Sequence, residues 1–242
     1  MSPTNNVPIV FLPGIGVTCK NLEPQKQFLE KKGVKVICLD WPAFDRKNFN
    51  FSHHADWVIN KLNELSIKKA GFLGQSRGGL ALIKIASKYP EHVAFAIINS
   101  APAGLGPKSI SPWFYWLVKL LSHVPSIFLK FSIKLANEFS SNPYIPMLLT
   151  NNPKELVSCY LDHMDYDWSE DIKKITVPTV FRYGQKDEWV KRAGTQAVTT
   201  SNKQVVYDQN SGHVAPKPEE LWDLIKKLHK TSSSKEILDL KC

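Results

Sequence analysis

The stretch Gly74-Gln75-Ser76-Arg77-Gly78 decides the predicted fold of this chain, because it matches the pattern G-x-S-x-G, in which a serine occupies a sharp turn between a strand and a helix. Alone, so short a pattern is weak support, and the alternative is that its glycines only pack a tight turn between a strand and a helix. The flanking sequence favours the first interpretation. An apolar run at 70–74 precedes the serine, and a helical pattern follows at 80–89. We therefore expect Ser76 at the carboxyl edge of a sheet, beside a helix N-terminus.

The same alternation of short apolar runs and helical periodicity extends along the chain on both sides of Ser76. This alternation is typical of βα units that build a buried parallel sheet. The runs that predict strands are residues 7–12, 34–39, 70–74, 93–99, 179–183 and 204–207. Amphipathic helices are expected between them, the clearest from Ser52 and the last from Pro218. The predicted fold class is α/β, with a mostly parallel sheet of about six strands and helices on both faces.

Between Ala103 and about Asp171 this rhythm stops, and the chain becomes helical and aromatic. We expect a core made of residues 1–102 and 172–230, a helical cap inserted at 103–171, and a flexible tail at 231–242. An insertion at this point should fold over Ser76, so Trp113, Trp116 and Leu117 are expected to line an apolar substrate pocket. The alternative for these three side chains is that they attach the cap to the sheet.

Two residues that suit catalysis with a serine follow the last two predicted strands. A serine hydroxyl is a poor nucleophile at neutral pH, so it needs a base within hydrogen-bond reach and a third group that orients the base. Asp187 follows the fifth strand and His213 follows the sixth, so both should reach the edge where Ser76 lies. We expect Ser76 to be the nucleophile, His213 the general base and Asp187 the orienting acid. Asp208 is the reserve candidate for the orienting acid. The alternative for His213 is a structural histidine, and the alternative for Asp187 is a solvated carboxylate.

Negative charge develops on the substrate carbonyl oxygen in the transition state of acyl transfer, and it needs two fixed N–H donors. We expect one donor to be the backbone N–H of Arg77 and the other to be the backbone N–H of Ile15. Ile15 lies in the loop Pro13-Gly14-Ile15-Gly16, whose glycines permit close approach of the backbone. The alternative for this loop is a simple Pro-Gly turn.

The net charge of the chain indicates which kinds of binding partner we expect. The 31 Lys and Arg residues exceed the 22 Asp and Glu residues, giving a formal net charge of +9. Such a balance favours an acidic partner such as nucleic acid, an anionic membrane surface or an acidic carrier protein. However, the lysines are scattered and no recognition motif is present, so no nucleic-acid binding is expected. No apolar run approaches the roughly 20 residues of a transmembrane segment.

The four cysteines lack the C-x-x-C pairs that zinc sites or redox centres use, so no metal is expected and the cysteines are predicted to be free thiols. The first residues have neither the basic start nor the apolar stretch of a signal peptide. Both observations predict a cytoplasmic protein.

Six short stretches of the sequence match a known family, and together they cover nearly the whole chain outside the insertion. They are residues 9–14, 40–44, 74–79, 89–93, 183–187 and 212–213. These stretches resemble the α/β-hydrolase superfamily, specifically its small single-domain esterase and carboxylesterase branch with a helical cap. The resemblance implies that a small-molecule carboxylic ester, or a thioester, is hydrolysed through an acyl-enzyme. It also implies that no metal or organic cofactor takes part.

The chain departs from the family pattern at three points. Pro13-Gly14 stands where the family usually has His-Gly, and too few residues precede Val7 for the antiparallel hairpin that commonly opens the fold. Arg77 replaces a small or apolar residue, and its side chain is expected either in a buried ion pair or at the pocket rim.

Two alternative functions stay open. One is a non-catalytic member that binds a ligand or acyl chain, and the other is a carboxylesterase or thioesterase for an acyl group on a carrier protein. An intact set of Ser76, Asp187 and His213 argues against the first, because a pocket that only binds has no use for an activated nucleophile.

Overall fold

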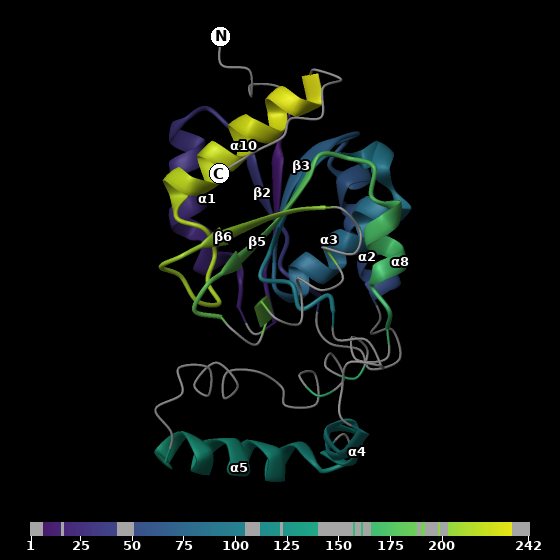
Figure 1. Cartoon of the computed structure of the whole chain (residues 1–242), viewed down its shortest axis with the longest axis vertical. Coiled ribbons are helices and arrows are strands. Elements are labelled where there is room, and N and C mark those ends of the chain that lie inside the picture. Colours follow the sequence, from purple (N-terminus) through teal and green to yellow (C-terminus); the bar gives the residue numbers. More distant parts are fainter. Residues whose placement is uncertain are drawn as a thin grey trace.

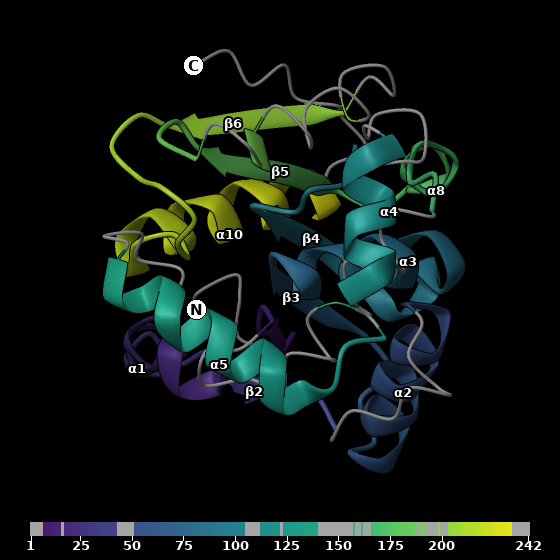
Figure 2. The same ribbon diagram turned by 90° about the horizontal axis from the view of Figure 1, so that it is seen from below.

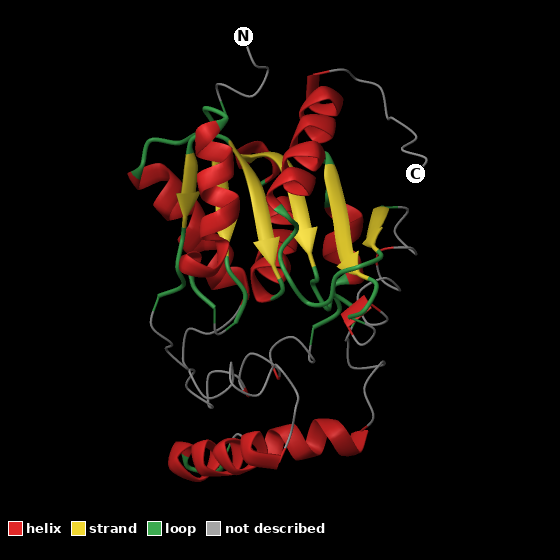
Figure 3. Ribbon diagram, turned by 90° about the vertical axis from the view of Figure 1, so that its left-hand side faces the viewer, coloured by secondary structure: helices red, strands yellow, loops and turns green. Residues whose placement is uncertain are grey.

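Six strands form a single parallel sheet in the order β2-β1-β3-β4-β5-β6 (Figures 1 and 3). The computed structural model describes residues 7–15, 17–42, 51–104, 112–121, 123–139, 157, 161, 166–187, 190–191, 198 and 203–233. The strands are β1 (Ile9–Leu12), β2 (Val36–Cys38), β3 (Ala70–Gln75), β4 (Val93–Asn99), β5 (Thr179–Gly184) and β6 (Gln204–Asp208). The predicted fold class, an α/β fold with a parallel sheet of about six strands, is confirmed.

Helices cover both faces of the sheet (Figure 1). One face packs against α1 (Glu23–Lys31) and α10 (Pro218–Ser233). The other face packs against α2 (Phe51–Glu64), α3 (Arg77–Lys88) and α8 (Ser169–Lys174). Short 3₁₀ helices, η1 (Cys19–Leu22) and η2 (Pro90–His92), precede α1 and β4. Because α10 continues to Ser233, residues 231–233 of the predicted tail are helical, and residues 234–242 lie outside the described part of the chain.

The strands are buried on both sides, and this explains their continuous apolar runs. All seven residues of β4 are buried. Successive side chains of a strand point to opposite faces, so Phe72 packs with α2 and α3 while Leu73 packs with α1 and α10. A parallel sheet covered by helices on both faces requires this kind of sequence.

The core resumes after the insertion earlier than the predicted boundary at residue 172. Trp168 and Ile172 are buried in the cluster formed with α2 and α3. On the same side, Nζ of Lys84 on α3 lies 2.8 Å from Oδ2 of Asp171 on α8, and both side chains are largely buried. Residues 168–174 therefore belong with the core.

Two helices of the insertion, α4 (Pro112–Leu121) and α5 (Ser126–Phe139), lie beyond the carboxyl ends of the strands (Figures 1 and 3). Seen from that side, they extend across the edge of the sheet (Figure 2). Among the described helices, none has the length and apolar character needed to cross a membrane.

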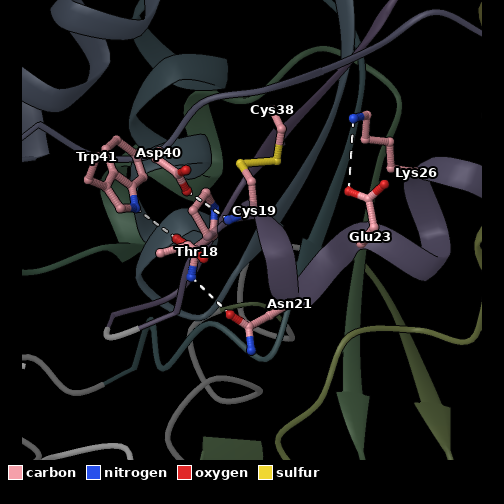
Figure 4. The surroundings of a disulfide bond; sticks show 9 residues. Thr18, Cys19, Asn21, Glu23, Lys26, Cys38, Asp40 and Trp41 are labelled. Atoms are coloured by element: carbon pink, nitrogen blue, oxygen red, sulfur yellow. Dashed lines mark hydrogen bonds and ion pairs between the residues drawn. A yellow bond between two sulfur atoms is a disulfide. The ribbon is translucent and has the colours of Figure 1, made fainter. Parts of the chain in front are cut away.

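The prediction of free thiols is wrong for Cys19 and Cys38, which form a disulfide with a Cα–Cα distance of 5.8 Å (Figure 4). Cys38 ends β2, and Cys19 begins η1, which follows the neighbouring strand β1. Strand pairing therefore brings together two cysteines that are 19 residues apart in the sequence. Disulfides persist in oxidising compartments, so the cysteines no longer support the prediction of a cytoplasmic location. Cys159 and Cys242 lie outside the described residues.

Candidate active site

Ser76 occupies the turn between β3 and α3 with a left-handed backbone, φ 53°. A non-glycine residue rarely adopts this conformation, which costs about 1–3 kcal/mol and persists only where the surroundings enforce it. Two backbone hydrogen bonds hold the turn: the Ser76 N–H donates to the Asn99 carbonyl at 2.8 Å, and the Ser76 carbonyl accepts from the Leu80 N–H at 3.0 Å. The strand-turn-helix context that the G-x-S-x-G pattern requires is therefore present.

Gly74 and Gly78 of the pattern lie where the structure leaves no room for a side chain. A Cβ atom on Gly78 would lie 2.0 Å from the carbonyl oxygen of Leu12, and one on Gly74 would lie 2.4 Å from the carbonyl oxygen of Gly78. The first turn of α3 thus lies directly against the end of β1. These glycines do pack a tight turn, and that packing is what positions Ser76.

Asp187 and His213 meet in the loops that follow β5 and β6. Nδ1 of His213 lies 2.6 Å from Oδ2 of Asp187, and the two side chains are 17% and 8% exposed. The two loops approach closely, because a Cβ atom on Gly184 would lie 2.2 Å from the carbonyl oxygen of Gly212. When Nδ1 carries the proton and donates to the carboxylate, Nε2 is the nitrogen that can act as a base.

The reserve acid, Asp208, has a different partner. Its Oδ2 atom lies 2.6 Å from Nη2 of Arg182, a fully buried side chain that also donates from Nε to Glu220 at 2.5 Å. Burial opposes the charge of Asp208, but hydrogen bonds from Asn210 and Ser211, together with the Arg182 guanidinium, lower the pKa of this carboxyl below its ordinary value. Asp208 is thus held as the ionised partner of Arg182.

Sequence reasoning missed Arg182, although a signal was present. An arginine inside the apolar run of the fifth strand must carry a charge into the core, and a buried charge needs partners. Those partners, Asp208 and Glu220, lie on β6 and α10, far from Arg182 in the sequence.

The loop after β1 lies against Ser76, where the second N–H donor is predicted. A Cβ atom on Gly14 would lie 3.3 Å from Cβ of Ser76 and 3.4 Å from the carbonyl oxygen of Gln75. Ile15 directly follows Gly14, and Arg77 directly follows Ser76 in the chain. Their roles in binding an oxyanion stay predictions, and Gly16 lies outside the described residues.

The Arg77 side chain was expected either in a buried ion pair or at the pocket rim. It is buried, and its neighbour is a histidine. Arg77 is 4% exposed, and its Nη2 atom lies 3.0 Å from Nε2 of His54. The guanidinium also lies over the ring of Trp41, 5.2 Å from the ring centroid. Burial lowers the pKa of His54 to about 3, and the charges of Arg77 and His53 act in the same direction. His54 is therefore neutral near neutral pH and accepts a hydrogen bond from Arg77.

The predicted pocket residues lie on α4 with exposed side chains. Trp113 is 71% exposed, Trp116 62% and Leu117 37%. Their contribution to a substrate pocket stays a prediction. Among the described residues, no group of three or more His, Cys, Asp and Glu side chains is arranged to hold a metal ion.

Comparison with known proteins gives a match over most of the chain. The profile of the family described as serine aminopeptidase, S33, matches residues 4–213. A pimeloyl-[acyl-carrier protein] methyl ester esterase of Legionella pneumophila (strain Corby) is 25% identical over 209 residues, which are 81% of this chain and 82% of that protein. A putative non-heme haloperoxidase of Mycobacterium phage D29 is 34% identical over 102 residues, 40% of this chain. That match spans 37% of the length of the phage protein.

Among solved structures, MenH from S. aureus superposes with a TM-score of 0.72 at 17% identity. The superposition covers 95% of this chain and 96% of that chain. At this level of identity the similarity shows that the fold is shared.

Proposed function

Because this chain belongs to the serine aminopeptidase S33 family of α/β-hydrolases, we propose that it hydrolyses carboxylic esters or thioesters with an apolar acyl group. The observation that carries the proposal is the 2.6 Å contact between His213 and Asp187, in loops at the same sheet edge as the strained turn of Ser76. A serine on such a turn, together with a histidine oriented by a carboxylate, is the apparatus of acyl transfer.

The proposed reaction has two acyl-transfer steps. The Ser76 hydroxyl attacks the substrate carbonyl carbon while Nε2 of His213 takes its proton, and Asp187 stabilises the imidazolium that forms. The backbone N–H groups of Ile15 and Arg77 donate to the developing oxyanion. The bond between the carbonyl carbon and the leaving oxygen or sulfur then breaks, and the imidazolium gives its proton to that atom, which departs as the alcohol or thiol. In the second step His213 takes a proton from a water molecule, which attacks the acyl carbon. The bond to Oγ of Ser76 then breaks, and the imidazolium returns the proton to Oγ as the acid leaves.

A second candidate is hydrolysis of an acyl ester or thioester attached to an acidic carrier protein. The esterase of Legionella pneumophila, which is named for a carrier-protein substrate, favours it, and so does the net charge of +9. The two candidates share the same triad and differ in how the substrate is presented. A comparison of kcat/KM for one acyl group, free and on a carrier protein, separates them.

Labelling with a fluorophosphonate tests the proposed chemistry directly. This probe phosphonylates an activated serine, so the wild-type protein should gain one adduct, and peptide mapping should locate it on Ser76. Ser76→Ala should not react and should lose at least about 10³-fold in kcat. Adding His213→Ala to this variant should cause little further loss, because the two residues act as a unit. A folded wild-type protein that neither reacts with the probe nor cleaves esters would instead be a non-catalytic binder.

A further inference from the structure

The helices α4 and α5 each carry an exposed apolar stripe. On α4 the stripe follows the spacing of one helical face, at Trp113, Trp116, Leu117 and Leu120, with exposed fractions of 71%, 62%, 37% and 65%. On α5 it consists of Ile127, Phe128, Phe131 and Leu135, with exposed fractions of 73%, 62%, 67% and 50%. A protein surface rarely exposes so many large apolar side chains close together unless they contact a partner.

The charge around these stripes identifies the kind of partner. The sequence contains no Asp or Glu from residue 92 to residue 137, and Glu138, next to the last residue of α5, is the acidic residue of that helix. Exposed Lys119, Lys130 and Lys134 lie on the two helices. On α5 the two lysines border the apolar stripe, since Lys130 lies three residues after Ile127 and Lys134 three residues after Phe131. Aromatic and aliphatic residues on one helical face, with lysines beside them, are typical of helices that lie in the interface of an anionic bilayer.

We propose that α4 and α5 dock on the surface of an anionic lipid bilayer, with their apolar stripes in the interface and their lysines at the lipid headgroups. Helices of 10 and 14 residues suit this orientation, because spanning the hydrocarbon core takes about 20 residues. The pair lies beyond the sheet edge that bears Ser76, so docking would bring that edge towards the lipid (Figures 1 and 3). A highly charged carrier protein fits less well, because it offers little apolar surface to so many aromatic side chains.

Sedimentation with lipid vesicles tests this proposal. The wild-type protein should bind vesicles that contain phosphatidylglycerol, bind pure phosphatidylcholine vesicles more weakly, and be released by salt. Ile127→Ser with Phe131→Ser should weaken binding at least about tenfold by removing apolar contacts. Lys130→Glu with Lys134→Glu should have a similar effect, because each basic residue contributes about 1 kcal/mol near an anionic surface. The control is Lys226→Glu with Lys227→Glu, the same change of charge on α10, and it should bind like the wild type.

Two results would overturn the lipid proposal. One is wild-type protein that does not sediment with either kind of vesicle. The other is a dimer in light scattering that Ile127→Ser with Phe131→Ser dissociates, since a second copy would then be the occupant. Circular dichroism checks that the variants fold, and no catalytic activity is needed for any of these measurements.

A second inference concerns Trp41, His54 and Arg77, which link the two segments that supply the predicted oxyanion donors. Nε1 of Trp41 donates to the Pro13 carbonyl at 2.8 Å, on the loop that leads to Ile15. Arg77 lies over the Trp41 ring and contacts His54 at 3.0 Å. The Trp41 bond fixes the Pro13–Gly14 peptide, which adjoins the peptide that carries the Ile15 N–H.

The loop that bears Trp41 is itself fixed by the Cys19–Cys38 disulfide and by the Cys19 N–H, which donates to Asp40 at 2.7 Å. We infer that Trp41 is a positioning residue, which holds the loop after β1 in register with the backbone of Arg77 for oxyanion binding. This inference rests on the proposed esterase function.

Trp41→Phe tests the positioning role, because it removes the N–H donor and keeps an aromatic ring under Arg77. The variant should lose about 10-fold or more in kcat with little change in KM, since the predicted interaction forms in the transition state. Its affinity for a trifluoromethyl ketone inhibitor should fall by a similar factor. The control, Trp222→Phe on α10, should keep the wild-type kcat.

A wild-type kcat in folded Trp41→Phe would overturn the positioning role, and so would a rise in KM alone. The proposed hydrolase function is tested separately, because it fails when the wild-type protein does not react with a fluorophosphonate.

Discussion

The carboxylate of Asp187 lies 2.6 Å from Nδ1 of His213, across two loops that are 26 residues apart in the sequence. If this contact orients the base, Asp187→Asn should lower kcat by about 10³ to 10⁴-fold with little change in KM, because the amide cannot stabilise the imidazolium. Steady-state kinetics with a p-nitrophenyl ester measures the effect. Asp208→Asn is the matched control, since Asp208 contacts Arg182, and it should retain most of the activity. A wild-type kcat in Asp187→Asn would remove Asp187 from the mechanism.

Gly78→Ala should destabilise the fold strongly, because the added methyl group would lie 2.0 Å from a backbone oxygen of β1, which cannot move aside as a side chain can. We expect a loss of about 3 kcal/mol or more in the free energy of unfolding, the upper range for overpacking a core. Gly212→Ala is the control, since nothing lies within 4 Å of its added Cβ atom. Urea denaturation of both variants provides the measurement, and equal stability would mean that the turn of Ser76 adapts.

The features that could be predicted from the sequence are those that follow from local order along the chain. The apolar run at 93–99 predicts the fourth strand, which is observed at Val93–Asn99, because a buried parallel strand is a continuous apolar run between turn residues. Asp187 and His213 were expected at one edge because parallel strands end together, and the structure brings them into contact. Their catalytic roles stay predictions.

The features that could not be predicted depend on contacts between distant parts of the chain. Cys19 and Cys38 meet only because β1 and β2 pair, and no local spacing pattern encodes that pairing. The contact between His54 and Arg77 joins α2 to the residue after Ser76, 23 residues away. Trp168 belongs to the core although it lies in a segment without strand periodicity, because α8 packs against α3.

The disulfide leads to a prediction about stability. A bond that closes a loop of this size stabilises the folded state by about 3 kcal/mol through the entropy of the unfolded chain. Dithiothreitol should therefore lower the urea midpoint of the wild-type protein. The variant Cys19→Ser with Cys38→Ser should start at the lower midpoint and respond to dithiothreitol much less. Peptide mapping of the unreduced protein should recover the Cys19–Cys38 crosslink, and its absence from protein purified without reductant would contradict the bond.

His54 should make stability depend on pH. Its folded-state pKa is lowered to about 3, so below the ordinary value of 6.5 the unfolded chain binds a proton that the folded chain does not. The contribution of His54 to stability is therefore complete above pH 6.5 and decreases as the pH falls towards 3. At about pH 5 the loss amounts to about 2 kcal/mol.

The variant His54→Gln should lack this loss, so the difference in unfolding free energy between about pH 7 and about pH 5 should shrink by about 2 kcal/mol. Urea denaturation at both pH values measures it, with the stability at neutral pH as the check that the variant folds. The same pH dependence in variant and wild type would mean that His54 is not buried as a neutral group.

The dependence of kcat/KM on the length of the acyl chain tests whether the enzyme has an apolar pocket to which α4 contributes. An apolar pocket gains up to about 0.8 kcal/mol for each buried methylene, so kcat/KM should rise up to about fourfold per methylene until the pocket is full. Butyrate and hexanoate esters of p-nitrophenol should therefore be better substrates than the acetate. Acetate as the best substrate in a series from acetate to decanoate would exclude the apolar pocket.

Trp113 is 71% exposed in this structure, so a role in the pocket would require that the bound acyl group contact this side chain. In that case Trp113→Ala should flatten the dependence on chain length with soluble esters. Phe131→Ala on α5 is the control, since Phe131 is 67% exposed and lies on the other apolar stripe, for which no role in the pocket is predicted. If both variants keep the wild-type dependence, Trp113 acts only at that surface. If Trp113→Ala alone flattens it, the same helix serves both the surface and the pocket.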